Sequence, residues 1–139
     1  MINNLDIEEQ LKNCVKNHNE SSSIPPICYA NDKILEIEKN ILFKKQWICL
    51  GHIKYLKKPG DYFTKLISDI PVIVIRDKSL KIRVFLNVCR HRSAKLIEGE
   101  GNTIRIVCPF HSWAYNLEGK LKGAPNMSEA KNFHKEEFG

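Results

Sequence analysis

The sequence predicts an all-β domain, an antiparallel sheet or sandwich, that follows a helical segment. From residue 47 onward, short runs rich in β-branched residues are separated by turn signals such as Asp77-Lys78-Ser79. Before that point, apolar residues recur at helical spacing. We therefore expect a helical N-terminal extension over residues 1–45 and a β domain over residues 46–139.

Two helices are expected in the N-terminal extension. The first covers residues 4–18, where one stripe is apolar, and a polar, proline-containing linker over residues 19–26 ends it. The second begins with Asn31 or Asp32 as its N-cap and carries its own apolar stripe. The stripe of the first helix consists of Ile7, Leu11, Cys14, Val15 and His18.

Several short strands are expected in the β domain. In the run from Lys81 to Asn87, alternation predicts that Ile82, Val84 and Leu86 point inward. The signal fades after Pro125, and residues 127–139 read as polar and without a clear element. The expected strands are residues 47–52, 61–67, 71–76, 81–87, 103–107 and 113–115.

Composition limits the classes of protein. The chain has 139 residues, 42% of them hydrophobic, which is enough for a core, and no apolar run approaches the roughly 18 residues of a membrane span. No signal peptide precedes the first helix, so we expect a cytoplasmic protein without a membrane partner. The net charge of +6 indicates a lysine-rich solvated surface or a basic face for an acidic partner. Nucleic acid is not expected, because the basic residues are spread along the chain.

The five cysteines are too few and too scattered for a disulfide framework, so thiols or metal thiolates are expected. Cys14 and Cys49 read as small core residues, and Cys28 has no assigned role. The remaining two belong to a motif that also contains histidines.

That motif is Cys89-x-His91, sixteen intervening residues, and Cys108-x-x-His111. Each half follows an apolar strand, so two loops at neighbouring strand ends can close on one metal centre. Two thiolates holding one iron and two neutral imidazoles holding the other are the ligands of a Rieske [2Fe–2S] cluster. The alternatives are a structural zinc site, whose usual spacings differ from these, and an accidental pairing of Cys and His.

The residues around this motif resemble the Rieske ring-hydroxylating oxygenases, in their large (alpha) subunit. The resemblance covers roughly residues 25–126 and includes Pro59-Gly60-Asp61-Tyr62 upstream. It implies a Rieske fold, an iron–sulfur cluster on Cys89, His91, Cys108 and His111, and one-electron transfer. The segments that carry it most clearly are 87–96 (NVCRHRSAKL), 98–101 (EGEG) and 108–119 (CPFHSWAYNLEG).

The chain departs from the family at several positions. Ser93 and Ser112 stand where glycine is usual, so the two loops are expected to differ slightly in backbone conformation. Ala94 and Phe110 occupy the positions of the extra disulfide of respiratory Rieske proteins, and Trp113 replaces their serine hydroxyl. Fewer hydrogen bonds to sulfur imply the low-potential oxygenase branch.

The resemblance also implies a mononuclear non-heme iron held by two His and one carboxylate in a C-terminal catalytic domain. Only His18, His52 and His134 remain for it, scattered singly, so we expect the N-terminal part of a longer protein from which that domain is absent. The implied donor is a ferredoxin or flavin reductase that draws on NAD(P)H, and a homo-oligomer is possible. The alternative is a stand-alone Rieske ferredoxin. Neither the substrate, nor mono- versus dioxygenation, nor a beta subunit can be inferred.

Two groups beside the motif have open interpretations. Arg90, Arg92 and Lys95 form either a solvated rim or a docking site for the electron donor. Tyr115 either packs in the sheet or also donates a hydrogen bond to a cluster sulfur or a ligand cysteine.

Overall fold

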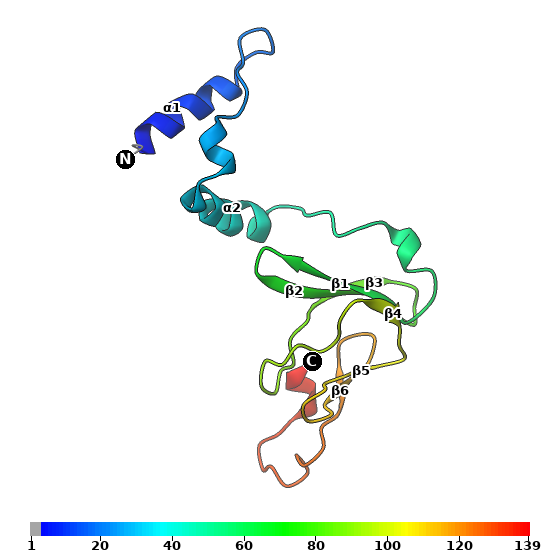
Figure 1. Ribbon diagram of the computed structural model, residues 1–139. Coiled ribbons are helices and arrows are strands. Elements are labelled where there is room, and N and C mark those ends of the chain that lie inside the picture. Colours follow the sequence, from blue (N-terminus) through cyan, green and yellow to red (C-terminus); the bar gives the residue numbers. More distant parts are fainter. Residues whose placement is uncertain (1–3) are drawn as a thin grey trace. The chain divides into compact units, whose positions relative to one another are not determined.

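The computed structural model describes residues 4–139. The chain divides after Trp47 into two compact units, the second of which is Ile48–Gly139. Figure 1 shows helices in the first unit and strands in the second. The two units are described separately below. The domain division after residue 45, made from the sequence, stays a prediction.

The first unit contains two α-helices, and the first is shorter than expected. Helix α1 spans Asn4–Cys14, so Val15 and His18 lie beyond its end. The backbone then turns, because the amides of Glu20 and Ser21 both donate to Asn17 O. Asn side chains compete for backbone hydrogen bonds and therefore favour turns over helix interiors. This explains why the helix ends before residue 18.

The second helix begins where the sequence places it. Helix α2 spans Asp32–Lys45, and the Asn31 side chain caps it by accepting a hydrogen bond from Lys33 N at 2.9 Å. Lys44 and Lys45 lie in the last turn, where cations favour the helix dipole. A short 3₁₀ helix, η1 (Pro26–Tyr29), precedes α2.

The second unit is built on two antiparallel sheets, which confirms the predicted all-β fold. The four-stranded sheet has the order β3-β2-β1-β4, and its central strand β2 is buried on both faces, from Val72 to Ile75. The three-stranded sheet has the order β5-β6-β7. The strands are β1 (Asp61–Ile67), β2 (Ile70–Arg76), β3 (Ile82–Leu86), β4 (Glu100–Asn102), β5 (Ile106–Val107), β6 (Ala114–Tyr115) and β7 (Leu121–Gly123).

One core joins the two sheets. Ile73 and Ile75 of the first sheet pack in the same buried cluster as Ile106, Tyr115 and Leu121 of the second. Ala94, Leu96 and Ile97, from the segment that links β3 to β4, pack against the same cluster. The loops that carry the Cys and His residues therefore leave from the edge of this shared core.

The expected strand at residues 47–52 is absent. This segment is extended without ladder pairing and leads into η2 (Ile53–Tyr55), which His52 caps by accepting from Lys54 N at 3.0 Å. Strand β1 is already paired on both edges, with β2 and β4, so no edge is open there. Cys49 is exposed, and its predicted core position is wrong.

The inward face of β3 is the opposite of the predicted one. Ile82, Val84 and Leu86 are 39–62% exposed, whereas Phe85 packs against the core. Arg83 lies on the same face as Phe85 and binds the buried carboxylate of Asp77 at 2.8 Å. Both faces of this strand contain apolar residues, so alternation alone could not choose between them.

Candidate metal centre

The first Cys–His loop, residues 89–94, follows β3 and closes on itself. Ser93 N donates to Cys89 O at 2.9 Å, and Cys89 N donates to Ala94 O at 2.8 Å. A bridge between Val88 and Lys95 extends this pairing by one step. The loop therefore has a defined shape that its own backbone maintains.

The second loop, residues 108–113, joins β5 to β6 with the same pattern. Ser112 N donates to Cys108 O at 3.1 Å, and Cys108 N donates to Trp113 O at 2.8 Å. Ser93 and Ser112 are equivalent in the two loops, with φ of 54° and 58°. The backbone thus keeps the left-handed conformation that glycine adopts without strain, so both loops retain a glycine-like shape.

A buried amide that the sequence did not single out fastens the base of the first loop. Asn87 is fully buried, and its Oδ1 accepts from Leu96 N and Ile97 N, each at 3.1 Å. Its Nδ2 donates to Ile97 O at 2.7 Å. Three hydrogen bonds from one side chain therefore join the end of β3 to the chain that returns from the loop. In the sequence, the signal for this role was a polar residue at the end of an apolar strand.

The two loop cysteines are buried beside a tyrosine. Cys89 is 1% exposed and Cys108 is 2% exposed, and both belong to the core cluster. The hydroxyl of Tyr115 lies 3.4 Å from Cys89 Sγ and accepts from Arg90 N at 3.2 Å. Burial raises the pKa of this hydroxyl above its ordinary value, and the contact with Cys89 raises it further. Tyr115 therefore packs in the sheet, and its hydroxyl also lies within hydrogen-bond distance of the Cys89 sulfur.

The two loop histidines lie next to each other. The rings of His91 and His111 have centroids 4.8 Å apart at 75°. Among the side chains that the structure describes, residues 7–139, Nδ1 of His91 is the one buried N or O atom without a hydrogen-bond partner. Burial, then the nearby His111 and Arg92, lower the pKa of His91, which favours the neutral imidazole that metals bind.

The chemistry of the donor set, two thiols and two imidazoles, fits a [2Fe–2S] cluster. Among the described residues, no group of three or more His, Cys, Asp or Glu side chains is arranged to hold a metal ion. A zinc site needs four donors around one point, whereas each iron of a Rieske cluster takes only two protein ligands. Two buried thiols and two adjacent imidazoles, one with an unpartnered nitrogen, suit this divided arrangement.

An aromatic cluster behind His91 was missed by the sequence analysis. The Trp113 ring stacks on His91 with centroids 4.8 Å apart and planes 9° apart. Phe133 and Phe138, from the segment expected to be polar and without an element, contact Trp113 at 5.5 and 5.6 Å. Phe138 ends a short 3₁₀ helix, η3 (Lys135–Phe138). Two isolated aromatic residues among charged ones gave no periodic signal.

The remaining Cys and His residues do not join this site. All five cysteines are free thiols. Cys14 is half-buried at the end of α1, where its thiol contacts Gln10 O at 3.5 Å. His52 caps η2, and His134 precedes η3.

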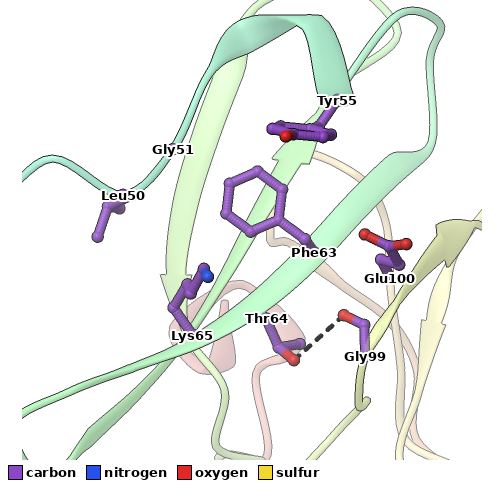
Figure 2. Close-up of a pocket in the computed structure, with 8 residues that line it drawn as sticks. All are labelled: Leu50, Gly51, Tyr55, Phe63, Thr64, Lys65, Gly99 and Glu100. Carbon is purple, nitrogen blue, oxygen red and sulfur yellow. Dashed lines mark hydrogen bonds between the residues drawn. The ribbon is translucent and has the colours of Figure 1, made fainter.

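A pocket of about 460 Å³ lies elsewhere in the second unit. In Figure 2 the rings of Tyr55 and Phe63 line it, and Thr64 donates a hydrogen bond to Gly99 O. Phe63 pairs with Val74, so it faces away from the core residues Ile73 and Ile75. The lining residues provide no thiol or imidazole, so this pocket is separate from the Cys–His loops.

The fold and these loops define an iron–sulfur β domain, and comparison with known proteins gives the particular family. The model of the Rieske [2Fe–2S] domain matches residues 46–134, and the chain belongs to this family. It is 36% identical over 115 residues to the carnitine monooxygenase oxygenase subunit of Acinetobacter baumannii, covering 82% of this chain and 31% of that protein. It is 37% identical over 112 residues to the benzene 1,2-dioxygenase subunit alpha of Pseudomonas putida, covering 80% and 25%.

Solved structures agree. Naphthalene 1,2-dioxygenase from Rhodococcus sp. matches with a TM-score of 0.84 at 29% identity, covering 99% of this chain and 32% of that one. The apo form of a quaternary ammonium Rieske monooxygenase matches with a TM-score of 0.77 at 36% identity, covering 84% and 34%. The expected resemblance to oxygenase alpha subunits is confirmed. The chain spans about 25–31% of the length of the first curated relatives.

Within residues 4–139, no helix is both long enough and apolar enough to cross a bilayer.

Proposed function

We propose that Cys89 and Cys108 hold one iron of a [2Fe–2S] cluster and that His91 and His111 hold the other. When bound, the cluster supplies one-electron redox chemistry, with neutral imidazoles reducing the negative charge at one iron. The observation that carries the assignment is the buried, unpartnered Nδ1 of His91 beside the ring of His111. An unsatisfied polar atom in a protein interior is costly, and a metal bond removes that cost.

The chain then serves as the electron-transfer part of a Rieske oxygenase. It accepts electrons singly from a ferredoxin or flavin reductase and delivers them to a mononuclear non-heme iron that activates O₂. The relatives are oxygenase subunits rather than stand-alone carriers, which favours this function over a ferredoxin. One of these relatives is named for carnitine and the other for benzene. Monooxygenation of a quaternary ammonium compound and catabolism of an aromatic hydrocarbon are therefore both consistent with the relatives. We place the protein in the cytoplasm, as a homo-oligomer.

The surface of the two loops suits an acidic electron donor. Arg90 and Arg92 of the first loop are exposed, and so are Phe110, at 69%, and its neighbour His111 in the second loop. Lys95 instead pairs with Glu98 at 2.6 Å. The unit Ile48–Gly139 carries sixteen Lys and Arg against nine Asp and Glu, whereas Met1–Trp47 carries six against seven. Long-range attraction would therefore guide an acidic partner to this unit.

Anaerobic purification tests the ligand assignment. The chain should be red-brown, with two irons and two sulfides, the composition of its family's cluster. The reduced form should have an EPR spectrum with an average g below that of all-cysteine clusters. Colourless protein that holds one zinc ion would contradict the assignment.

Voltammetry tests the oxygenase function separately. The potential at neutral pH should lie toward about −150 mV, the low end of the Rieske range, because Ala94, Phe110 and Trp113 supply no disulfide and no hydroxyl. A potential well above zero would contradict the oxygenase function even if the cluster were present.

A further inference from the structure

The segment that follows β7 contributes two rings to the surroundings of one proposed iron ligand. Phe133 and Phe138 contact each other, with centroids 5.0 Å apart. Both also contact Trp113, Phe133 in a tilted geometry and Phe138 at 90°. Trp113 in turn lies flat against His91. The rings therefore form a continuous series of contacts, here called the aromatic column, from η3 to His91.

The aromatic column holds the orientation of the His91 ring. A metal-bound imidazole is usually oriented by a hydrogen bond to its other ring nitrogen. The face of the His91 ring instead rests on Trp113, which is 2% exposed and has little room to move. If Trp113 tilts, the plane of His91 must tilt with it, and the direction of Nδ1 changes.

His111 provides an internal contrast. It is exposed, and its neighbour Phe110 makes only an edge contact at 6.2 Å and 77°. No stacked ring is recorded for His111 among the described residues. The two imidazoles thus differ in what fixes them, although their loops close in the same way.

We propose that Phe133 and Phe138 are positioning residues that orient the His91 imidazole toward its iron by acting through Trp113. The proposal rests on the ligand assignment above, because His91 must be a ligand for its orientation to matter. It assigns a role in the redox site to the segment 133–138, which contains no ligand. The expected consequence of weakening the column is a disturbed bond at His91 with an unchanged bond at His111.

The first measurement uses the chain without iron. The chain has two tryptophans, and Trp47 is fully exposed, so a Trp47→Phe background leaves Trp113 as the only indole. In this background, Phe133→Ala and Phe138→Ala should shift the Trp113 emission to longer wavelength and increase its quenching by acrylamide. The matched control Phe110→Ala should change neither, because Phe110 contacts His111 and not Trp113. An unchanged emission in both variants would overturn the proposal.

The second measurement uses the full chain with its cluster. Pulsed EPR resolves the couplings of the two ligand nitrogens, and Phe133→Ala should alter one coupling and leave the other. Loss of the cluster in air should accelerate about 10-fold, as expected for a residue that orients a ligand. Phe133→Leu, which keeps the burial and loses the ring, should behave as Phe133→Ala, whereas Phe133→Tyr should restore the native spectrum. If the alanine variants do not fold, the leucine and tyrosine pair decides.

Three outcomes separate the proposals. Nitrogen couplings that stay native in Phe133→Leu while the emission of Trp113 shifts would show that the column only fills space, and would overturn the inference. Equal changes at both nitrogens would also overturn it. A wild-type chain that binds no [2Fe–2S] cluster would instead overturn the ligand assignment on which the inference rests.

Discussion

The two Cys–His loops share a backbone and differ in where they place their histidine. In each, the cysteine N–H and C=O are both used to close the loop, and the serine four residues later has a positive φ. Yet His91 is half-buried against Trp113, whereas His111 is exposed. The same loop backbone therefore places the His91 imidazole against the protein and the His111 imidazole in solvent. Of the two proposed histidine ligands, His111 is therefore the one that a partner in solution can reach.

The loops also differ in what fastens their bases. The side chain of Asn87 ties the first loop to residues 96 and 97, while the second loop is simply the connection of the β5–β6 hairpin. The first loop does not connect two neighbouring strands, because β3 and β4 lie on opposite edges of their sheet, and its base is paired only by the isolated Val88–Lys95 bridge. The Asn87 side chain adds hydrogen bonds to this short pairing.

The largest effect is expected where the loops are alike. Cys89→Ser and Cys108→Ser should each reduce the iron content from two atoms per chain to about none, because a hydroxyl is a poor ligand for this cluster. Iron and acid-labile sulfide analysis measures this. Cys28→Ser and Cys49→Ser are the controls and should keep the cluster. If either control lost it, the cysteine ligands would have been assigned wrongly.

The next effect should separate the loops. Asn87→Ala leaves the partly buried N–H groups of Leu96 and Ile97 without this partner, and should lower the free energy of unfolding by about 3 kcal/mol. Urea denaturation of the apo chain measures it. Asn102→Ala, which removes two side-chain hydrogen bonds at an exposed site, should cost less than about 1 kcal/mol. Equal losses in both variants would argue against a special role for Asn87.

A smaller effect is expected at the hydroxyl that only the first loop contacts. Reduction adds negative charge at the sulfurs, so Tyr115→Phe removes a donor that favours the reduced form. The potential should fall by about 60 mV if the hydrogen bond strengthens by about 1.4 kcal/mol on reduction. Because the pKa of Tyr115 is raised, the hydroxyl stays protonated and this difference should persist up to pH 10, the ordinary pKa of tyrosine. Film voltammetry measures it, with Tyr55→Phe as an exposed control.

The smallest effect should again be equal in the two loops. Ser93→Gly and Ser112→Gly relieve a positive φ, and each should raise the free energy of unfolding by about 1 kcal/mol, after the greater flexibility of glycine in the unfolded chain is allowed for. Thermal denaturation of the apo chain measures both. Ser79→Gly, at a turn position without a positive φ, should instead be neutral or destabilising. A gain in the free energy of unfolding in only one of the two variants would show that the backbones of the two loops are less alike than their hydrogen bonds indicate.

Sequence patterns predicted the features that are local in the chain. The cap at Asn31, the strands near 61–67 and 71–76, and the Cys–His spacing depend on neighbours a few residues apart. The face of β3, the unpaired segment 47–52 and the aromatic column depend on partners far along the chain. Phe133 and Trp113 are twenty residues apart and meet only because the chain folds back after the second sheet. No helical or strand periodicity in the sequence predicts such a contact.

The closure of both loops by protein atoms has a consequence for how the iron–sulfur centre is assembled. Zinc fingers fold only when their metal arrives, so their binding and folding are one event. Here backbone hydrogen bonds from Ser93 N to Cys89 O and from Ser112 N to Cys108 O help to shape each loop, so the metal is not the sole source of the loop conformation.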